Sequence, residues 1–585
     1  GDHLSRREAT DSSNTGGTLR ASGLMTAIAG HDLSSSSTLG GSMGNITFDR
    51  PAGIYVQSDS GQLSLQAGHD INLTASQISN VGTGSQTQLV AGNDLNLATL
   101  TTTHSEKGDW GGGNNRTLTQ SLDNGTMING SGDVSLSAGH DLNARAATVT
   151  AQDELKVVAG NALTLTYGNE SYHLTENSHQ SSSGLLSKKS VTTHDEIQSQ
   201  GAAGSAFSGN TVAIQAGHDL TVTGSSVTGT QDVGLTAGNN LTINTADETR
   251  KEVHQYKEKK SGFSATGGVG FSVGTSSLKI TDDGQNLTSL GSTIGSTQGN
   301  VNLTAGNVLS TQGSELLAAK DLNLTGQQVN ILSADNQSSQ THTVEQKQSG
   351  LTLALSGTAG SAINTAVMGA REAGKQSNDR LAVLQGMKSV LSGVQAVQSV
   401  SLAEAGGSDG NLAGINLSYG SQSSKSTQTS TQSQSQGSTL TAGNNLTLNA
   451  TGTDISVQGS QLQAGKEVSL NAARDVNLFS GLNSQTLEGK NESHGSSVGA
   501  GINFGQGSGG VTVSASVNKG KGSETGNGIS HNETTINAGN HLTINSGRDT
   551  TLTGAQVSGE KVTLDVGRHL TLTSEQDTDN YDSTQ

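Results

Sequence analysis

The sequence predicts an all-β fold: a right-handed parallel β-helix, or solenoid, with extra-helical β-hairpin excursions and one α-helical excursion. The first observation is a repeat of roughly 21 residues in which short runs of alternating apolar and polar residues flank a turn. The second is a composition of 30% hydrophobic and 2% aromatic residues with 80 glycines, too few large apolar side chains for a globular core. The third is a single proline, Pro51, which suits strands that pair on both sides. A unit this short cannot bury its own apolar face, so its copies must stack.

The repeat is clearest at residues 208–244, which read SGNTVAIQAGHDLTVTGSSVTGTQDVGLTAGNNLTIN. Val212 and Ile214 alternate with polar residues before the turn, and Leu220 and Val222 do so after it. This alternation separates the chain from a disordered one of similar hydrophobicity. About 15 coils stacked at about 4.8 Å give a rod roughly 70 Å long.

Each turn carries Ala-Gly followed by His or Asn and then Asp or Asn. We expect its glycine to supply a positive φ, and the Asn and Asp side chains to bond the local backbone and to stack in ladders that fix the strand register. The glycines of the strict copies are Gly30, Gly68, Gly92, Gly139, Gly160, Gly217, Gly238, Gly306, Gly443 and Gly539.

Rung segments alternate with segments that break the repeat. The predicted β-helix rungs are residues 1–97, 132–166, 208–246, 287–334, 438–480 and 533–585. The predicted excursions are residues 98–131, 167–207, 247–286, 335–437 and 481–532. The excursions share a pattern, because His254 and His342 are each followed at the same offset by Ser-Gly and then Phe or Leu.

The last excursion predicts a hairpin, because alternating apolar runs at residues 498–504 and 511–517 flank a glycine-rich turn. The third excursion repeats this pattern at residues 263–273, whereas residues 378–404 have helical apolar spacing and predict an amphipathic helix. These apolar faces either dock on the solenoid flank or contact a target membrane. The candidate membrane or partner contacts are Phe263, Val269, Phe271, Val273, Leu381, Leu384, Met387, Leu391, Ile502, Phe504, Val511, Val513 and Trp110.

Trp110, the only tryptophan, lies in a glycine-rich loop tip, Gly-Asp-Trp-Gly-Gly-Gly. An exposed aromatic residue of this kind can anchor a partner. We expect it instead to fold back onto the flank of the solenoid.

The sequence predicts no catalytic residue, cofactor or metal site. The Gly-His-Asp turns could stack as metal ligands, but Asn replaces His in other copies, which a turn tolerates and a coordination site does not. Residues 406–410 and 495–499 match G-x-S-x-G and residues 505–510 match G-x-G-x-x-G, yet none opens an α/β unit. A net charge of −18 without a basic stripe argues against nucleic acid, and the absence of cysteine excludes disulfides.

The repeated AGHDL and AGNNL turns, interrupted by excursions of the form H-x-x-x-x-x-x-S-G-[FL], resemble the haemagglutinin repeats of filamentous-haemagglutinin-type exoproteins. The resemblance covers nearly the whole chain and is closest to the second repeat region of CdiA-like effectors of contact-dependent growth inhibition. It implies two-partner secretion through a dedicated outer-membrane transporter, a β-helical filament on the surface of a Gram-negative bacterium, and delivery of a C-terminal toxin. In the family, the second repeat region is associated with the target-cell outer membrane.

The resemblance therefore predicts a non-catalytic stalk that helps to deliver the toxin. Its expected partners are the target-cell outer membrane or its surface components, the export transporter and the C-terminal toxin. We recognise no secretion-directing domain and no toxin module, so we expect the delivery apparatus without its cargo. Two alternatives stay open: a haemagglutinin-type adhesin for cell–cell or host attachment, and a glycan-active β-helix enzyme. Carboxylates of adjacent rungs that converge in a groove would favour the enzyme.

Overall fold

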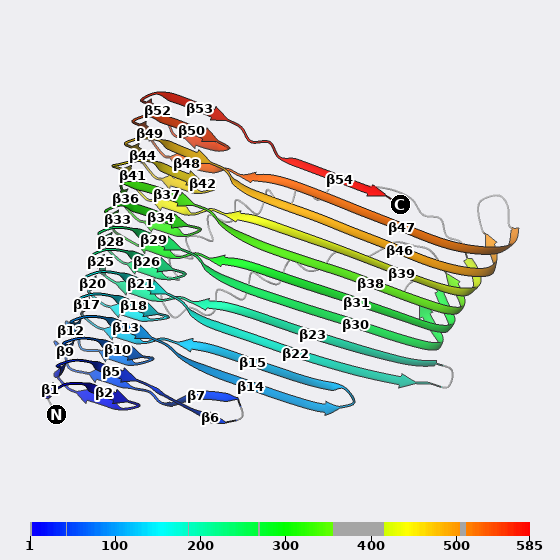
Figure 1. Cartoon of the computed structure of the whole chain (residues 1–585), viewed down its shortest axis with the longest axis horizontal. Coiled ribbons are helices and arrows are strands. Elements are labelled where there is room, and N and C mark those ends of the chain that lie inside the picture. The colour runs from blue at the N-terminus through cyan, green and yellow to red at the C-terminus, as the bar shows by residue number, and fades with distance from the viewer. Residues whose placement is uncertain are drawn as a thin grey trace.

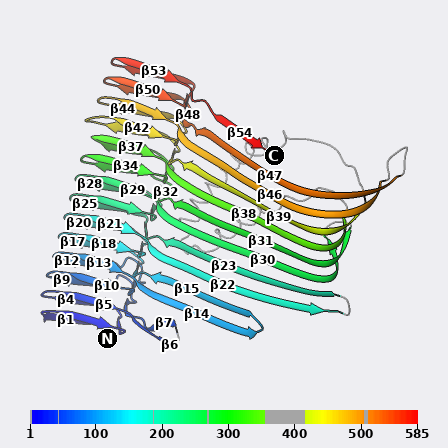
Figure 2. The same cartoon turned by 45° about the vertical axis from the view of Figure 1, so that its right-hand side comes forward.

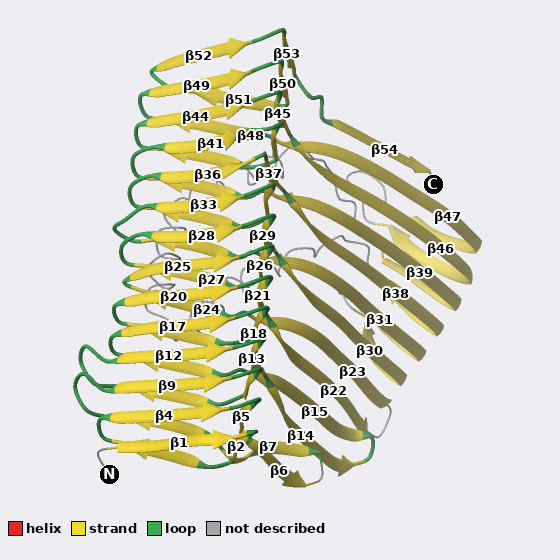
Figure 3. Ribbon diagram, turned by 60° about the vertical axis from the view of Figure 1, so that its left-hand side comes forward, coloured by secondary structure: helices red, strands yellow, loops and turns green. Residues whose placement is uncertain are grey.

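The computed structural model describes residues 3–42, 44–184, 187–266, 270–354, 415–503 and 510–584. Within these ranges the chain is a parallel β-helix, as predicted, and a fourth sheet extends from one corner of it (Figure 1, Figure 3). The described residues contain no helix, and hence no helix of the length and apolarity needed to cross a bilayer. The predicted helix near 378–404 is not confirmed, because this segment lies outside the described residues.

Each coil contributes one strand to each of three parallel sheets, which we call A, B and C in the order in which the chain visits them. Sheet A has 14 strands. They are β1 (His3–Ala9), β4 (Leu24–Ala29), β9 (Gln62–Ala67), β12 (Gln86–Ala91), β17 (Asp133–Ala138), β20 (Glu154–Ala159), β25 (Thr211–Ala216), β28 (Val233–Ala237), β33 (Val301–Ala305), β36 (Leu322–Gly326), β41 (Leu446–Ala450), β44 (Glu467–Ala472), β49 (His541–Ser546) and β52 (Lys561–Val566).

Sheet B also has 14 strands, and sheet C has 13. Those of sheet B are β2 (Ser12–Thr15), β5 (Leu33–Ser36), β10 (Ile71–Thr74), β13 (Leu95–Ala98), β18 (Leu142–Arg145), β21 (Leu163–Thr166), β26 (Leu220–Thr223), β29 (Leu241–Asn244), β34 (Val308–Gln312), β37 (Gln328–Leu332), β42 (Ile455–Gln458), β45 (Val476–Phe479), β50 (Asp549–Thr553) and β53 (His569–Thr573). Those of sheet C are β3 (Thr18–Ala21), β8 (Gly53–Val56), β11 (Gln77–Asn80), β16 (Met127–Gly130), β19 (Thr148–Ala151), β24 (Ala206–Gly209), β27 (Ser226–Gly229), β32 (Thr293–Ser296), β35 (Glu315–Ala318), β40 (Thr439–Ala442), β43 (Gln461–Ala464), β48 (Thr534–Ala538) and β51 (Ala555–Ser558).

The core of the solenoid is a set of apolar columns in which each coil stacks on the next. Leu235 of β28 pairs with Ile214 on one side and Leu303 on the other, and all three side chains are buried. The alternating pattern read from the sequence therefore places every second residue of a strand inside. Full burial of each such side chain contributes roughly 1.5–3 kcal/mol relative to exposure.

The Ala-Gly turns need glycine because of steric crowding. The prediction that their glycines adopt a positive φ is wrong. The turn glycines are absent from the left-handed region, and a Cβ on Gly217 would lie 2.0 Å from the carbonyl oxygen of Gly160 in the coil below. The close approach of stacked backbones thus excludes any side chain. The turn also changes place, because Gly306 follows a strand of sheet A whereas Gly443 follows a strand of sheet C.

The predicted side-chain ladder is confirmed at the corner between sheets A and B. Asp70 Oδ1 accepts the backbone N–H of Asp94 at 3.0 Å, and Asp94 Oδ1 accepts that of Asp141 at 3.0 Å. The pKa of Asp70 and the pKa of Asp141 both lie below the usual range. Partial burial raises the pKa of Asp70, but hydrogen bonds from Asn93 and Asp94 more than offset this effect. Burial likewise raises the pKa of Asp141, and hydrogen bonds from Ala162 and Asn161 more than offset it.

The corner between sheets B and C alternates between two connections. In every second coil the chain turns directly into sheet C through a residue with positive φ, among them Ala75, Ala146, Gly224, Gly313, Gly459 and Gly554. In the coils between, it leaves as a long excursion and returns to sheet C. Pro51 lies at such a return, between β7 and β8, as expected of a residue that cannot donate to a ladder.

The excursions form one antiparallel sheet of 13 described strands, sheet D. Its strands lengthen from 5 residues in the first to 23 in the last hairpin, and the final strand has 7 (Figure 1). They are β6 (Thr38–Ser42), β7 (Asn45–Arg50), β14 (Leu100–Gly111), β15 (Asn114–Asn124), β22 (Gly168–Ser183), β23 (Ser187–Ala203), β30 (Ala246–Thr266), β31 (Gly270–Leu290), β38 (Ala334–Ala354), β39 (Ile415–Gln436), β46 (Gly481–Asn503), β47 (Gly510–Asn532) and β54 (Thr578–Thr584). The hairpin β6–β7 and strand β54 fall in segments for which the sequence predicts only rungs.

The spacing of coils explains why separate hairpins join into one sheet. Two coils advance the solenoid by about 9.6 Å, and a hairpin is two strands, or about 9.6 Å, wide. One hairpin per two coils therefore brings the returning strand of each hairpin against the outgoing strand of the next, as in the pair β23–β30. The excursions accordingly pair with one another instead of packing separately on the solenoid flank.

From the junction of β15 with β22 onward, a carboxylate or carboxamide oxygen closes each junction between successive hairpins near the solenoid. Asp123 does so most fully: its carboxylate accepts the N–H of Asn169 at 2.9 Å, the hydroxyl of Thr101 at 2.5 Å and Arg145 Nη2 at 2.8 Å. Burial raises the pKa of Asp123, but these three donors hold it below its usual range. The equivalent acceptors are Glu248, Asn336, Asn483 and Asp577.

Candidate functional site

Sheet D places large apolar residues of three hairpins in one exposed row. Val273 pairs with Leu351, Leu351 with Tyr419, and Tyr419 with Val498. Directly paired residues of an antiparallel sheet share a face, so this apolar row is continuous across four strands. The side chains are 38%, 40%, 69% and 64% exposed, respectively. In the backbone register of β30 and β31, Val273 pairs with Phe263.

The other predicted contact residues of the third and fifth excursions lie in the same outer part of sheet D or outside the described residues. Ile502 pairs with Val511, Ala500 with Val513, and Ala265 with Phe271. Val269 and Phe504 lie outside the described residues, as do Leu381, Leu384, Met387 and Leu391. The sequence pattern thus locates the strands, and Val498 begins one of its predicted apolar runs, but Leu351 and Tyr419 are not among the predicted contacts.

A basic row runs parallel to the apolar row, four residues nearer the solenoid. Its register joins, in order, Ser181, Ser190, Lys259, Ser277, Lys347, Ser423, His494 and Lys519. Here the outer ends of the strands curve (Figure 2), and the sheet encloses a concavity of about 950 Å³ that also receives Lys188 and His179. We call it the lysine groove. Its lining contains five lysines and no aspartate or glutamate.

Four exposed groove lysines have no carboxylate within ion-pair distance among the described residues: Lys188, Lys259, Lys347 and Lys519. Lys189 and Lys260, each next in sequence to one of these four, are paired, and Lys260 also borders the groove. Lys189 Nζ lies 2.8 Å from Glu258 Oε2, and Lys260 also binds Glu258. Partial burial raises the pKa of Glu258, but hydrogen bonds from Lys189, Lys260 and Tyr256 lower it to about 2. The free ammonium groups therefore gather on the groove face.

Histidines and aspartates alternate across three hairpins on the face opposite the groove. Asp195 pairs with His254, His254 with Asp282, and Asp282 with His342. His254 Nδ1 lies 2.8 Å from Asp195 Oδ1, and His342 Nδ1 contacts Asp282. The hydrogen bond with Asp195 raises the pKa of His254, although burial opposes it. This row links the second, third and fourth of the long hairpins, counted from β14–β15.

Trp110 is not folded onto the solenoid flank as predicted from the sequence. It lies near the tip of the shorter hairpin β14–β15, is 68% exposed, and covers Gly108 of its own strand, where a Cβ would lie 2.8 Å from the indole. Because this hairpin is about half the length of the later ones, Trp110 does not join the apolar row. It remains a separate candidate for a partner contact.

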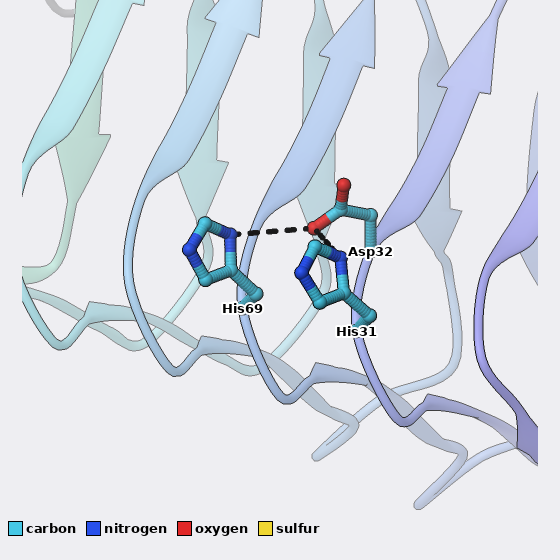
Figure 4. A group of neighbouring side chains, drawn as sticks. All are labelled: His31, Asp32 and His69. Atoms are coloured by element: carbon cyan, nitrogen blue, oxygen red, sulfur yellow. Dashed lines mark ion pairs between the residues drawn. The ribbon is translucent and has the colours of Figure 1, made fainter.

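Figure 4 shows the geometry of the histidine turns at His31 and His69, for which the sequence predicts no metal site. The rings of His31 and His69 stack at 4.7 Å with an interplanar angle of 6°, and their Nδ1 atoms lie 3.0 and 3.5 Å from Asp32 Oδ1. Lone pairs lie in the ring plane, so parallel rings cannot direct two of them at one ion. Asp32 Oδ1 also accepts the N–H of Asp70 at 3.1 Å. The geometry fits a turn ladder better than coordination; Asp94, His140 and Asp141 form a similar cluster.

The carboxylates of this ladder are the groups that a glycan-active enzyme would have to use. The ladder does bring carboxylates of adjacent coils together, but each carboxylate accepts a backbone N–H of the next coil. The pKa of Asp219 is lowered, as are those of Asp70 and Asp141. For Asp219 burial alone raises the pKa, and bonds from Asn240, His218 and Asn239 reverse it. A glycosidase needs a carboxylic acid of raised pKa as proton donor. These carboxylates do not provide one.

The signal that could have found the groove lies in the shared pattern of the excursions. Lys259 and Lys347 follow His254 and His342 at the same offset of five, just before the Ser-Gly pairs. Aligned hairpins therefore place the two lysines in one row. The lysines are far apart in the sequence, so the basic row is not visible as a charge cluster. The motif at residues 495–499 lies inside β46, with no strand-to-helix elbow.

Coils of this length, stacked through Ala-Gly turns and interrupted by paired hairpins, define a repeat-built β-solenoid. The family model described as "Hemagglutinin repeat" matches residues 111–262, 186–307 and 417–585, and the chain belongs to this family. It is similar to "Deoxyribonuclease CdiA" of Yersinia pseudotuberculosis, with 49% identity over 63% of this chain and 34% of the relative. It is also similar to "Deoxyribonuclease CdiA" of Dickeya dadantii, with 39% identity over 93% of this chain and 16% of the relative.

A third relative is "16S rRNA endonuclease CdiA" of Enterobacter cloacae, 42% identical over 72% of this chain. The chain spans 13% of that protein, and thus corresponds to a segment of much longer relatives. No solved structure gives a significant match.

Proposed function

We propose that this chain is a non-catalytic stalk region of a two-partner-secreted toxin of contact-dependent growth inhibition. The relatives named as CdiA proteins carry this region within far longer chains. The proposed setting is the surface of a Gram-negative bacterium, reached through an outer-membrane transporter, with the toxin elsewhere in the full-length protein.

The names of the relatives support a region without nuclease activity. They specify different activities, a deoxyribonuclease, a 16S rRNA endonuclease and a tRNA nuclease, yet all share the segment that matches this chain. A segment common to all of them does not distinguish one nucleic acid from another. The difference in substrate must reside outside the shared region, which acts as the carrier.

We further propose that the outer face of sheet D engages the outer membrane of the target cell. The observation that carries this proposal is the apolar row Val273, Leu351, Tyr419 and Val498, which is exposed and continuous across hairpins. Contiguous exposed apolar surface marks contact with a protein or a membrane. Tyr419 in the row suits the lipid–water interface, where tyrosine places an apolar ring and a polar hydroxyl.

A charge-insertion experiment tests the membrane contact. In the triple variant Leu351→Asp, Tyr419→Asp and Val498→Asp, co-flotation of the protein with outer-membrane vesicles should fall to background, because ionised side chains resist transfer from water. The control is Val81→Asp, Val562→Asp and Leu572→Asp, which changes three exposed apolar residues of the solenoid. Far-UV circular dichroism should match the wild type in both. Retained vesicle binding in the sheet D variant, or equal loss in the control, would refute the proposed contact.

A further inference from the structure

We propose that the lysine groove binds the headgroup of a net-anionic, phosphate-bearing lipid while the adjoining apolar row lies against the hydrocarbon of the same membrane. This inference rests on the proposed function and adds to it a lipid class and an orientation. It makes the outer end of sheet D, and not the solenoid, the part that meets the bilayer.

The charge of the groove is local and unneutralised. Lys188, Lys259, Lys347 and Lys519 are exposed, lack carboxylate partners among the described residues, and line a concavity without an acidic residue. The chain as a whole carries a net charge of −18, so this basic surface is not a consequence of composition. Unpaired ammonium groups that converge on one cavity favour an anion, and lysine suits phosphate as a point charge.

The two rows have the spacing that an amphiphile requires. Lys347 and Leu351 lie on one strand four residues apart and therefore on the same face, about 14 Å apart along the strand. A row of small hydroxyl residues that includes Ser349 separates them and supplies further donors. A membrane surface places phosphate next to hydrocarbon, which matches a basic row next to an apolar row. A soluble anion would match only the basic row.

The lining argues against the other common polyanion, a nucleic acid. Proteins that hold single strands combine cations with aromatic side chains on which bases stack. The described lining of the groove contains lysine, serine, threonine, glutamine, asparagine, glycine, histidine and Val517, but no phenylalanine, tyrosine or tryptophan. Among the described residues, the hydrophobic surface beside this lining consists of Val517 and the apolar row, which suits acyl chains better than bases.

The test compares two variants of the full chain in vesicle co-sedimentation. The groove variant carries Lys188→Gln, Lys259→Gln, Lys347→Gln and Lys519→Gln. The matched control carries Lys156→Gln, Lys320→Gln, Lys466→Gln and Lys561→Gln, which removes the same charge from exposed positions of the solenoid. The probes are phosphatidylcholine vesicles and phosphatidylcholine vesicles that contain phosphatidylglycerol. Circular dichroism verifies that both variants fold.

The wild type and the control variant should prefer the anionic vesicles, and the groove variant should bind them on the order of a hundredfold more weakly. The preference should shrink as salt is added. Groove-variant binding equal to the control would overturn the inference. Equal wild-type binding to both vesicle types would overturn it while leaving the proposed membrane contact intact, whereas no binding to either would refute both. Full competition by inorganic phosphate, or lysine-dependent binding of a single-stranded oligonucleotide without vesicle binding, would also overturn it.

Discussion

The solenoid and sheet D are built from the same chain but held together by different means. In the solenoid, inward side chains such as Leu235 and Leu241 are fully buried in columns shared by successive coils. In the described part of sheet D, most side chains are half-buried or exposed, and those that are buried lie mainly where the strands leave the solenoid, as Asp123 and Ser435 do. Apolar burial stabilises the first region. The second depends on backbone pairing, cross-strand polar contacts and its attachment to the first.

This difference explains how a large, polar sheet can exist beside a narrow core. The solenoid fixes the distance between successive hairpins, so the hairpins do not need a hydrophobic layer of their own to find their partners. Their faces are therefore free to carry function. On one face they hold the lysine groove and the apolar row; on the other they hold the histidine–aspartate row.

The largest expected effect is on the free energy of unfolding, and it appears when the same Leu→Ala change is made in the solenoid and in sheet D. Leu235→Ala should lower the free energy of unfolding by about 2–5 kcal/mol, because it leaves a cavity in the stacked core. Leu351→Ala, in the exposed apolar row, should change it by no more than about 0.5 kcal/mol. Urea unfolding followed by circular dichroism measures both. Similar losses in the two variants would mean that sheet D contributes a core of its own.

A smaller effect compares two glycines. Gly217→Ala should cost about 1–3 kcal/mol, because the new Cβ would lie 2.0 Å from the carbonyl oxygen of Gly160 and the stacked turns must separate. Gly284→Ala in β31 is the matched control, since a Cβ there meets no atom within 4 Å. Thermal melts of both variants provide the measurement. An unchanged melting temperature for Gly217→Ala would show that the stacked turns can move apart to accommodate the Cβ. Steric crowding would then not explain the glycine.

The smallest effect concerns pH and is confined to sheet D. The pKa of His254 is raised by its bond with Asp195, so its stabilising contribution is complete below the unfolded pKa near 6.5 and is lost as the pH rises through the higher folded value. Amide exchange between β23 and β30, corrected for intrinsic rates, should therefore accelerate from pH about 6 to about 9. The variant His254→Gln should lack this dependence, and solenoid amides should not share it. A pH-independent junction in the wild type would contradict the assignment.

Much of the solenoid could be predicted from the sequence because its signals are local. Val212 and Ile214 alternate within one strand, and the turn follows at once. The union of the hairpins could not be predicted in this way, since it depends on how many coils separate them, and the three corners of a coil look alike in sequence. For the same reason, the sequence does not reveal that the Ala-Gly turn lies at another corner at Gly443, and it predicts rungs where the short hairpin β6–β7 lies.

The candidate site was predicted only in part, for a related reason. The sequence predicts Val273 as a contact because this residue belongs to an alternating run. Tyr419 and Lys519 gain their meaning only from residues that lie opposite them in a sheet assembled from distant segments. A row across strands leaves no continuous trace along the chain unless the excursions are first aligned with one another.

The match between two coils and one hairpin also constrains how such a protein can change in length over evolutionary time. Loss or gain of a single coil would separate two hairpins by one or three strand spacings and break the seam between them. The heritable module is thus a pair of coils together with its hairpin. Duplication of that module adds rod length and one further two-strand panel of the outer surface in the same event, so reach and contact area increase together.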